Sequence, residues 1–377
     1  MRRIGILGGM MDPVHRGHLA AAKAALAAGM DTVLLAPCLA PPHRPAPLAA
    51  AEHRLEMCRL AAQEDGRLEA SDIDLRHETC YAADTARLLA KRYPGAELYW
   101  IIGADKLPGL SRWHEAEALF SLCQFLVCPR PGASDDIAVP GARVTRLDMQ
   151  PIAASSGDAI QRLRALEDAP ELLPKALARY IAQNGLYQPD YVPALRCYGM
   201  QDKRLQHTLG VRDTAVELAS LHGASMQAAA VAAMLHDIAK PLPLAEMQRV
   251  VRGYGLALPE EVTRDANLLH GPAAAAIAEN ELGVTHPGVL SAIGCHTTGK
   301  PGMSILDKVI FIADAIEPNR RPYPGLEDMR RLARTDLDAA VLLSMRRTNE
   351  YVLSRGYHFC HQTELAMEYL QQKEEKS

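Results

Sequence analysis

A chain of 377 residues is longer than one hydrophobic core usually serves, so its length favours two domains. Hydrophobic residues make up 48% and charged residues 23% of the sequence, the balance of a globular protein in water. We find no apolar run of the roughly 18–20 residues that a membrane-spanning helix needs, and we expect no signal peptide. A net charge of −4 argues against a protein that coats nucleic acid, but not against small anionic substrates.

The first half of the chain alternates strand-like and helix-like segments. Buried-strand patterns occupy Arg3–Leu7, Thr32–Ala36, Glu97–Ile102 and Phe125–Cys128. Helical patterns occupy His18–Ala28, Ala82–Arg92 and His114–Leu119. Such alternation predicts an α/β domain with a parallel sheet covered by helices.

A change of pattern marks the predicted domain boundary. Leu172–Tyr187 is helix-like with a break at Gly185, and Gln188–Pro193 then carries two prolines and no periodicity. We therefore predict domains at residues 1–188 and 189–377. The second domain should be all-helical, with a frayed tail from Gln371. Its helical patterns occupy Leu205–His222, Met226–His236, Gly271–Leu282, Ile305–Ile316 and Asp336–Arg355.

The cysteines indicate a reducing compartment. They are scattered, without C-x-x-C spacing, which excludes a secreted disulfide framework and a zinc ribbon. We predict reduced thiols in a cytoplasmic protein. The eight are Cys38, Cys58, Cys80, Cys123, Cys128, Cys197, Cys295 and Cys360.

The first cluster of chemical residues follows the first predicted strand. Gly8 and Gly9 would let the backbone approach a nucleotide, and the helix that follows offers free N–H groups to phosphates. His15 and His18, three residues apart at that helix start, can face the same phosphate. Asp12 would help to position the bound phosphates, or it would only form part of the turn that leads into the helix.

This Gly-Gly-Met-Met-Asp-Pro-Val-His-Arg-Gly-His stretch resembles the signature of the nucleotidylyltransferase superfamily, whose members have a Rossmann-like sheet. Residues 1–188 are similar, more specifically, to bacterial nicotinate-nucleotide adenylyltransferases. Supporting stretches are Pro41–Arg44, Asp72–Arg76, Asp84-Thr85, Ile101–Asp105, Trp113-His114, Cys128–Gly132 and Leu172–Tyr187.

The resemblance implies transfer of AMP from ATP to nicotinate mononucleotide, with Mg²⁺ and without a covalent intermediate. His15, His18 and Arg44 would stabilise charge on the phosphates. Gly103 and Asp105 would hold the adenosine ribose. Trp113, which alone would pass for a core residue, would stack on the pyridine ring, and Thr85 would orient that substrate. The other substrate-binding residues implied are Gly8, Gly9, Met10, Asp12, Arg130, Ser155 and Ser156.

Two departures leave an alternative open for this half. The family usually has Ser or Thr and then Phe where Met10 and Met11 stand. Its closing phosphate motif is altered here, so that Arg162 or Arg164 would replace a displaced arginine. A weakly active nucleotide sensor is therefore the alternative interpretation.

The second half carries a set of histidines and aspartates on or near the apolar faces of its predicted helices. Buried His and Asp side chains are costly unless they are paired or bind metal, and six of them are better explained by a metal centre than by chance. They are His207, His236, Asp237, His270, His296 and Asp314.

Their order resembles the HD phosphohydrolase superfamily over about residues 195–360, and within it the symmetrical diadenosine tetraphosphatases. The resemblance implies a dinuclear site, with Asp237 bridging two metal ions. One ion would be held by His207, His236 and Asp314, and the other by His270 and His296. Nitrogen and oxygen donors without thiolate suit iron foremost, with Mn, Co or Mg as alternatives.

The implied reaction is metal-assisted hydrolysis of diadenosine tetraphosphate into two ADP molecules. Lys240 and Arg320 would neutralise the phosphate chain, and Lys203, Arg204 and Arg321 are weaker candidates. Another nucleotide substrate remains the alternative. We therefore predict a bifunctional enzyme of NAD biosynthesis and nucleotide hydrolysis. Its partners would be ATP, nicotinate mononucleotide and diadenosine tetraphosphate, without nucleic acid or membrane, and homo-oligomerisation stays open.

Overall fold

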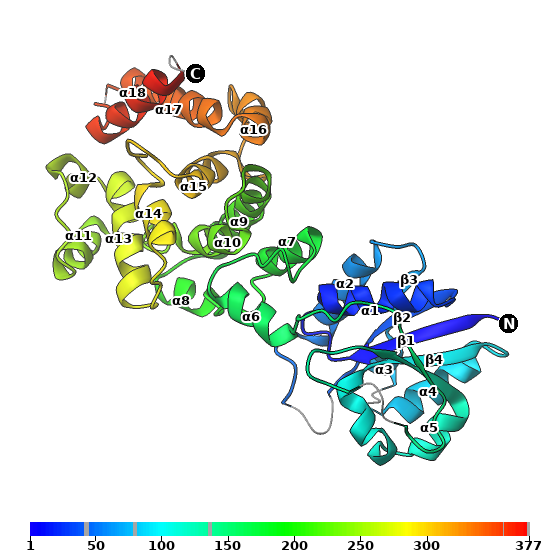
Figure 1. Ribbon diagram of the computed structural model, residues 1–377. Helices are drawn as coiled ribbons and strands as arrows, with labels where there is room; N and C mark the ends of the chain where they lie inside the picture. The colour runs from blue at the N-terminus through cyan, green and yellow to red at the C-terminus, as the bar shows by residue number, and fades with distance from the viewer. Residues whose placement is uncertain (41–44, 78–80, 135–137, 357, 375–377) are drawn as a thin grey trace. The chain divides into compact units, whose positions relative to one another are not determined.

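The computed structural model describes residues 1–40, 45–77, 81–134, 138–356 and 358–374 (Figure 1). Two compact units make up the chain: Met1–Ala165 with Ala169–Tyr180, and Leu166–Asp168 with Ile181–Ser377. The first is an α/β unit and the second is helical, which confirms the predicted fold class. The domain boundary at residue 188 stays a prediction. Among the described helices, none combines the length and apolarity that crossing a bilayer requires.

The first unit is built on a six-stranded parallel sheet with the order β3-β2-β1-β4-β5-β6. The strands are β1 (Arg3–Gly9), β2 (Thr32–Pro37), β3 (Leu68–Ala70), β4 (Glu97–Gly103), β5 (Cys123–Cys128) and β6 (Val144–Arg146). This is the strand order of a dinucleotide-binding Rossmann sheet. Because the order reverses between β1 and β4, the carboxyl ends of these central strands open a crevice where such sheets bind ligands.

Helices cover this sheet, and the apolar side chains of both form its core. They are α1 (Arg16–Ala27), α2 (Ala51–Ala62), α3 (Ile73–Arg76), α4 (Ala82–Arg92), the 3₁₀ helix η1 (Ala104–Arg112) and α5 (Ala116–Leu122). Ile4 and Ile6 of β1, Leu89 of α4 and Phe125 of β5 are fully buried there. Two further helices, α6 (Ser156–Arg164) and α7 (Lys175–Gln183), follow β6, and the division between the two units falls within α7. The sequence prediction missed β3, β6, α2, α3 and α6, and it made α7 too long at both ends.

The second unit has no strand among its described residues. Its helices are α8 (Val192–Cys197), α9 (Asp202–His222), α10 (Met226–Leu235), α11 (Leu244–Gly253), α12 (Glu260–Arg264), α13 (Ala266–Asn280), α14 (Pro287–Cys295), α15 (Ile305–Ile316), α16 (Leu326–Thr335), α17 (Leu337–Ser354) and α18 (His361–Glu374). The Ala-rich α10 is buried along its whole length. It packs against α9, α14 and α15, and thereby forms the centre of the unit.

Three predictions for this unit need correction. The expected linker contains the start of α8, because Pro193 lies in the first helical turn, where the missing N–H costs nothing. Helix α13 begins five residues early, where the Asp265 side chain accepts the Asn267 N–H. The tail is helical through residue 374, since Leu370 is buried and Lys373 pairs with Asp338 at 2.7 Å.

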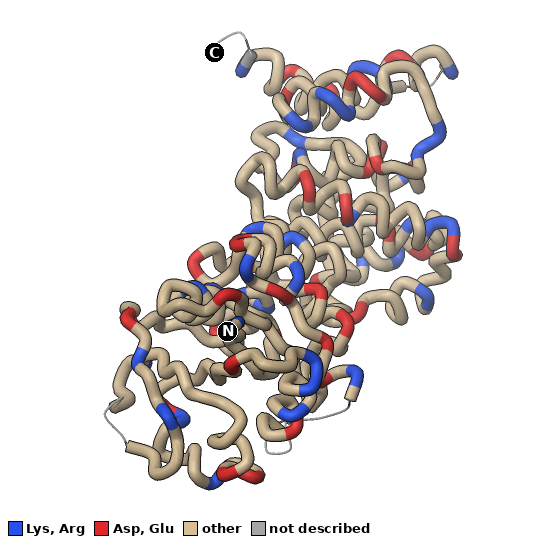
Figure 2. The backbone as a smooth tube through the Cα atoms, turned by 90° about the vertical axis from the view of Figure 1, so that its right-hand side faces the viewer, with Lys and Arg blue, Asp and Glu red and all other residues tan. Residues whose placement is uncertain are grey.

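Charges of both signs are interspersed along the described chain (Figure 2). Cationic groups that recognise phosphate must therefore act locally, at particular sites.

Candidate functional sites

The first site lies where β1 ends and α1 begins. His15 is the N-cap of α1: its Nδ1 accepts the Gly17 N–H at 3.1 Å, while His18 Nδ1 accepts the His15 N–H at 3.2 Å. Each Nδ1 is thereby an acceptor, so the proton of a neutral ring resides on Nε2. The two rings lie 3.8 Å apart between centroids. The helix start thus carries a pair of Nε2–H donors. The sequence-based expectation of free N–H groups there is wrong, because Arg16, Gly17 and His18 already donate their N–H groups within the chain.

Both histidines are uncharged at neutral pH. Burial, with the nearby Arg130 guanidinium, lowers the pKa of His15 to about 4. Burial also lowers the pKa of His18 well below its ordinary value, and the other ring and Arg130 act in the same direction. The site can therefore donate hydrogen bonds through imidazole while Arg130 supplies its positive charge.

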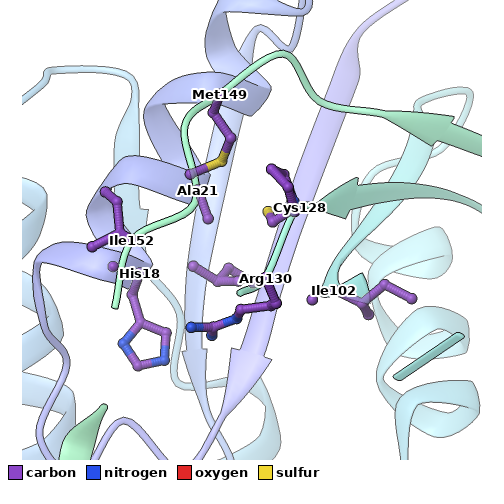
Figure 3. Close-up of a pocket in the computed structure, with 11 residues that line it drawn as sticks. His18, Ala21, Ile102, Cys128, Arg130, Met149 and Ile152 are labelled. Carbon is purple, nitrogen blue, oxygen red and sulfur yellow. The ribbon is translucent and has the colours of Figure 1, made fainter. Parts of the chain in front are cut away.

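A pocket joins this helix start to the ends of β4 and β5. Figure 3 shows the Arg130 guanidinium extending toward the His18 ring inside it. Gly103, at the end of β4, lines the same pocket, and a Cβ there would meet both Asp105 and Arg130. The glycine predicted to hold the ribose is thus the only residue type that leaves those side chains in place. The lining residues are Leu7, Gly17, His18, Ala21, Ile102, Gly103, Cys128, Pro129, Arg130, Met149 and Ile152.

Two buried charged side chains fix the loops after β1 and β2. Asp12 accepts the N–H groups of Leu48 and Ala49 at 2.6 and 3.2 Å. Arg54 on α2, 1% exposed, donates to the carbonyls of Met10 at 2.8 Å and of Cys38, Leu39 and Ala49 at 2.6 to 3.1 Å. Sequence reasoning missed Arg54, because α2 itself was not predicted and an arginine on a helix usually faces solvent.

Other predicted residues of this half make structural contacts. Thr85 is buried, with its hydroxyl 2.6 Å from Asp74, a carboxyl whose pKa burial raises to about 6. Ser155 caps α6 by accepting the Asp158 N–H, and Ser156 donates to the Pro13 carbonyl.

The remaining predicted residues of this half have other positions or lie outside the described residues. Trp113 follows η1, half-buried, and Asp105 pairs with Lys106 at the surface. Gly8 and Gly9 are the last two residues of β1, and Met10 follows directly after it. The predicted Arg44 and Cys80 lie outside the described residues.

The second site brings together all six predicted donors. They come from α9 (His207), the end of α10 (His236 and Asp237), α13 (His270), the end of α14 (His296) and α15 (Asp314). His207 Nε2 lies 3.0 Å from Asp314 Oδ1, and His270 Nε2 lies 3.2 Å from Asp237 Oδ1. His270 Nε2 and His296 Nε2 are 3.1 Å apart. Nothing in the spacing along the chain predicts these distances; the packing around α10 creates them.

The donor set fits a divalent metal ion. His236 Nδ1 and His296 Nδ1 face carbonyls of their own helices at 2.6 and 2.7 Å, so those nitrogens carry the protons and leave the Nε2 lone pairs bare. The buried His236 Nε2 has no hydrogen-bond partner among the described residues. Donor atoms of His207, His236 and Asp314 lie within 4.8 Å of one another, as do those of His236, Asp237 and His296. The cluster can therefore hold a divalent metal.

The charge states in this cluster suit a cation. Burial lowers the pKa of His296 to about 3, with His270 and His236 acting in the same direction. Burial opposes ionisation of Asp237, but the surrounding histidines outweigh it and hold the pKa of this carboxyl well below its usual range. A neutral His296 imidazole beside an ionised Asp237 carboxylate has the protonation state that metal binding requires. The carboxylates of Asp314 and Glu317, by contrast, raise the pKa of His207 against the effect of its burial.

Cationic side chains border the cluster. Arg320 donates to the carbonyl and the carboxylate of Asp314 at 2.8 and 2.5 Å, and Lys240 Nζ lies 3.3 Å from His270 Nδ1. Arg204, considered a weaker candidate from sequence, contacts Asp237 at 2.7 Å. Sequence reasoning assigned no role to Glu317, which is buried 3.1 Å from His207 Nδ1.

Comparison with known proteins finds one family model in each part of the chain. The Cytidylyltransferase-like family model matches residues 6–168, and the HD domain model matches residues 204–319. A Mycoplasma pneumoniae protein named "Probable nicotinate-nucleotide adenylyltransferase/Ap4A hydrolase" is 30% identical over 84% of this chain and 88% of its own length.

Single-activity relatives match each half separately. A Halalkalibacterium halodurans protein named "Bis(5'-nucleosyl)-tetraphosphatase, symmetrical" is 42% identical over 42% of this chain and 83% of its own. An Opitutus terrae protein named "Probable nicotinate-nucleotide adenylyltransferase" is 38% identical over 50% of this chain and 98% of its own. The chain, a cytidylyltransferase-like domain followed by an HD domain, therefore belongs to the family of that two-activity Mycoplasma protein.

Proposed function

We propose that this chain is a bifunctional cytoplasmic enzyme. Its first unit transfers AMP from ATP to nicotinate mononucleotide, giving deamido-NAD and pyrophosphate, and its second hydrolyses diadenosine tetraphosphate to two ADP. The names of the relatives of each half support these activities. The observation that carries the proposal is the convergence of six metal-type donors in one unit of a chain whose other unit has a paired-histidine helix start.

In the first reaction, the nicotinate mononucleotide phosphate attacks the α-phosphorus of ATP, and pyrophosphate leaves. His15 and His18 donate from Nε2 to phosphate oxygens, where negative charge grows as the bond breaks. Arg130, which lines the same pocket as His18, would bind the same phosphates, and the N-terminal end of the α1 dipole favours their negative charge. Mg²⁺ bound with ATP would neutralise part of the triphosphate charge.

In the second reaction, His207, His236 and Asp314 would hold one metal ion, and His270 and His296 a second, with Asp237 shared. Iron is the metal we propose first, since all donors are nitrogen or oxygen. Metal ions bound there would activate water and offset charge on the phosphate chain. Lys240 and Arg320 would bind phosphate oxygens of the substrate, and Arg204 lies close enough to the cluster to join them.

Separate inactivation of the two sites tests the proposal. The wild-type chain should form deamido-NAD and pyrophosphate from ATP and nicotinate mononucleotide, and should release only ADP from diadenosine tetraphosphate. His18→Ala should lower the rate of AMP transfer about 100-fold and leave the rate of tetraphosphate hydrolysis unchanged. Asp237→Asn should do the reverse, and the exposed-histidine control His361→Gln should change neither.

Product analysis by ion-exchange chromatography separates the alternatives. Release of AMP and ATP from the tetraphosphate would contradict symmetrical cleavage. A wild-type chain that forms no dinucleotide under saturating ATP, Mg²⁺ and nicotinate mononucleotide would make the first unit a nucleotide sensor. Two contacts favour testing this second function. Ser155 is engaged in a helix cap and Arg162 pairs with Glu171, so neither side chain points freely to a phosphate.

A further inference from the structure

One histidine of the metal cluster is oriented differently from the others. His236, His270 and His296 each place Nδ1 against a backbone carbonyl three or four residues earlier in the chain. His207 places Nδ1 against a carboxylate oxygen, Glu317 Oε1, at 3.1 Å. A carboxylate acceptor fixes the proton on Nδ1, and it makes Nε2 a stronger electron donor than a carbonyl acceptor does.

Glu317 is built into the protein rather than placed by chance. The residue is 1% exposed, and its second oxygen accepts the Asn319 N–H at 2.6 Å. Arg330 donates to the Glu317 backbone carbonyl at 3.0 Å and thereby fixes the chain just after α15. Because a buried carboxylate is costly unless it is paired, this arrangement requires a compensating partner, and the His207 ring is that partner.

The opposite helix leaves room for this carboxylate. Gly210 lies three residues after His207, on the same face of α9. A Cβ at Gly210 would lie 2.5 Å from Glu317 Oε2 and 3.1 Å from Asn319 Nδ2. Any other residue at this position would displace the Glu317 side chain from His207.

We propose that Glu317 is a positioning residue of the metal centre. It holds His207 in the tautomer and ring orientation that present Nε2 to metal, and Gly210 provides the space for it. Its direct contact is with His207, which belongs to the donor group of His207, His236 and Asp314 and not to the group of His236, Asp237 and His296, so its effect should fall mainly on the first group. The inference rests on the proposed function of the second unit as a metal-dependent hydrolase.

Metal affinity, measured on the full chain by competition between protein and a chromogenic chelator for Mn²⁺, tests it. Wild type should bind Mn²⁺ in two steps. Glu317→Gln keeps the size of the side chain, but its amide cannot accept from both the His207 ring and the Asn319 N–H. We expect this variant to weaken one step about 10- to 100-fold and to leave the other unchanged.

A second variant covers the case in which Glu317→Gln fails to fold. Gly210→Ala leaves Glu317 in the sequence and favours the helix, because alanine is the better helix former, yet it pushes the carboxylate away. The same selective weakening is expected. Gly253→Ala at the end of α11, where a Cβ meets no atom within 4 Å among the described residues, is the matched control and should bind Mn²⁺ like wild type.

The outcomes separate the inference from the function beneath it. Two unchanged steps in Glu317→Gln and Gly210→Ala overturn the positioning role while the hydrolase proposal stands. Equal weakening of both steps also overturns it, because general disturbance of the fold would act on both donor groups. A wild-type chain that binds neither Mn²⁺, Fe²⁺ nor Co²⁺ overturns the hydrolase proposal, and the inference with it.

Discussion

The histidine pair at the start of α1 gives the first unit a calculable acid sensitivity. His15 titrates at 6.5 in an unfolded chain but at about 4 when folded. Between these values the unfolded chain binds a proton that the folded unit refuses, so stability falls as the pH falls, by up to about 3 kcal/mol. His15→Asn, which retains an N-cap acceptor, should remove this loss. Urea unfolding at pH 7 and pH 4.5 measures it, and fluorescence reports the first unit because both tryptophans, Trp100 and Trp113, lie there.

Asp74 supplies a control of opposite sign. Its folded pKa of about 6 lies above the ordinary 3.8, so the folded unit takes up a proton that the unfolded chain does not. That gain appears as the pH falls through 6 and is complete below 3.8. Asp74→Asn should therefore make the acid-induced loss of stability steeper, where His15→Asn makes it shallower. The assignment is wrong if both variants change the slope in the same direction.

At the scale of single residues, the sequence identifies side chains whose polarity or charge is unusual for the apolar segment in which they stand. Histidines and aspartates on apolar helix faces predict a metal cluster, and the structure brings all six together. Sequence analysis does not identify Arg54 and Glu317, because charged residues are common on helix surfaces. Only the folded structure shows that these two are buried. Their partners are backbone groups or residues far along the chain, so spacing carries no signal for them.

Helix α2 acts as a support for the nucleotide loops, and its buried arginine is the means. Arg54→Met should leave four backbone carbonyls without this donor, at about 1–3 kcal/mol for each that stays buried. We expect the first unit to lose about 3 kcal/mol or more of stability and AMP transfer to fall, with tetraphosphate hydrolysis unchanged. Tryptophan-detected urea unfolding and the two rate assays measure this.

The same helix offers the control. Arg59 points to solvent, where it pairs with Glu56 one turn away. Arg59→Met should change stability by less than about 0.5 kcal/mol, as surface substitutions usually do. Similar losses in both variants would show that Arg54 acts only through the helix propensity of α2.

Element prediction succeeded where a segment is long and apolar and failed where it is short or polar. The central strands β1, β2, β4 and β5 are continuous apolar runs, as a sheet covered on both faces requires. The edge strands β3 and β6 have three residues each, too few to show a period. Helix α16 does carry buried apolar residues at helical spacing, namely Leu326, Met329 and Ala333, but charged residues fill most of the remainder, and the prediction did not recognise its apolar face.

At the scale of the whole molecule, each unit has its own core and its own site. We therefore expect a mixture of the His18→Ala and Asp237→Asn chains to show both activities. The Asp237→Asn chain should supply AMP transfer and the His18→Ala chain should supply tetraphosphate hydrolysis, each at the rate of its intact site. The two rate assays, run with all substrates present, compare this mixture with the wild-type chain. A faster wild-type chain at equal site concentration would show that the two sites influence each other within one chain.

Metal removal should separate the two units thermodynamically. A ligand that binds only the folded state stabilises it by about 4 kcal/mol at a thousandfold excess over its dissociation constant, and chelation removes that contribution. The effect should fall on the second unit alone, since its donors all come from α9, α10, α13, α14 and α15.

Urea unfolding with and without EDTA tests this expectation. Tryptophan fluorescence follows the first unit, and far-ultraviolet circular dichroism follows both. EDTA should leave the fluorescence transition in place and move a separate dichroism transition to lower urea. A fluorescence transition that moves equally would mean that the units unfold as one, and two unmoved transitions would mean that metal does not stabilise the helical unit.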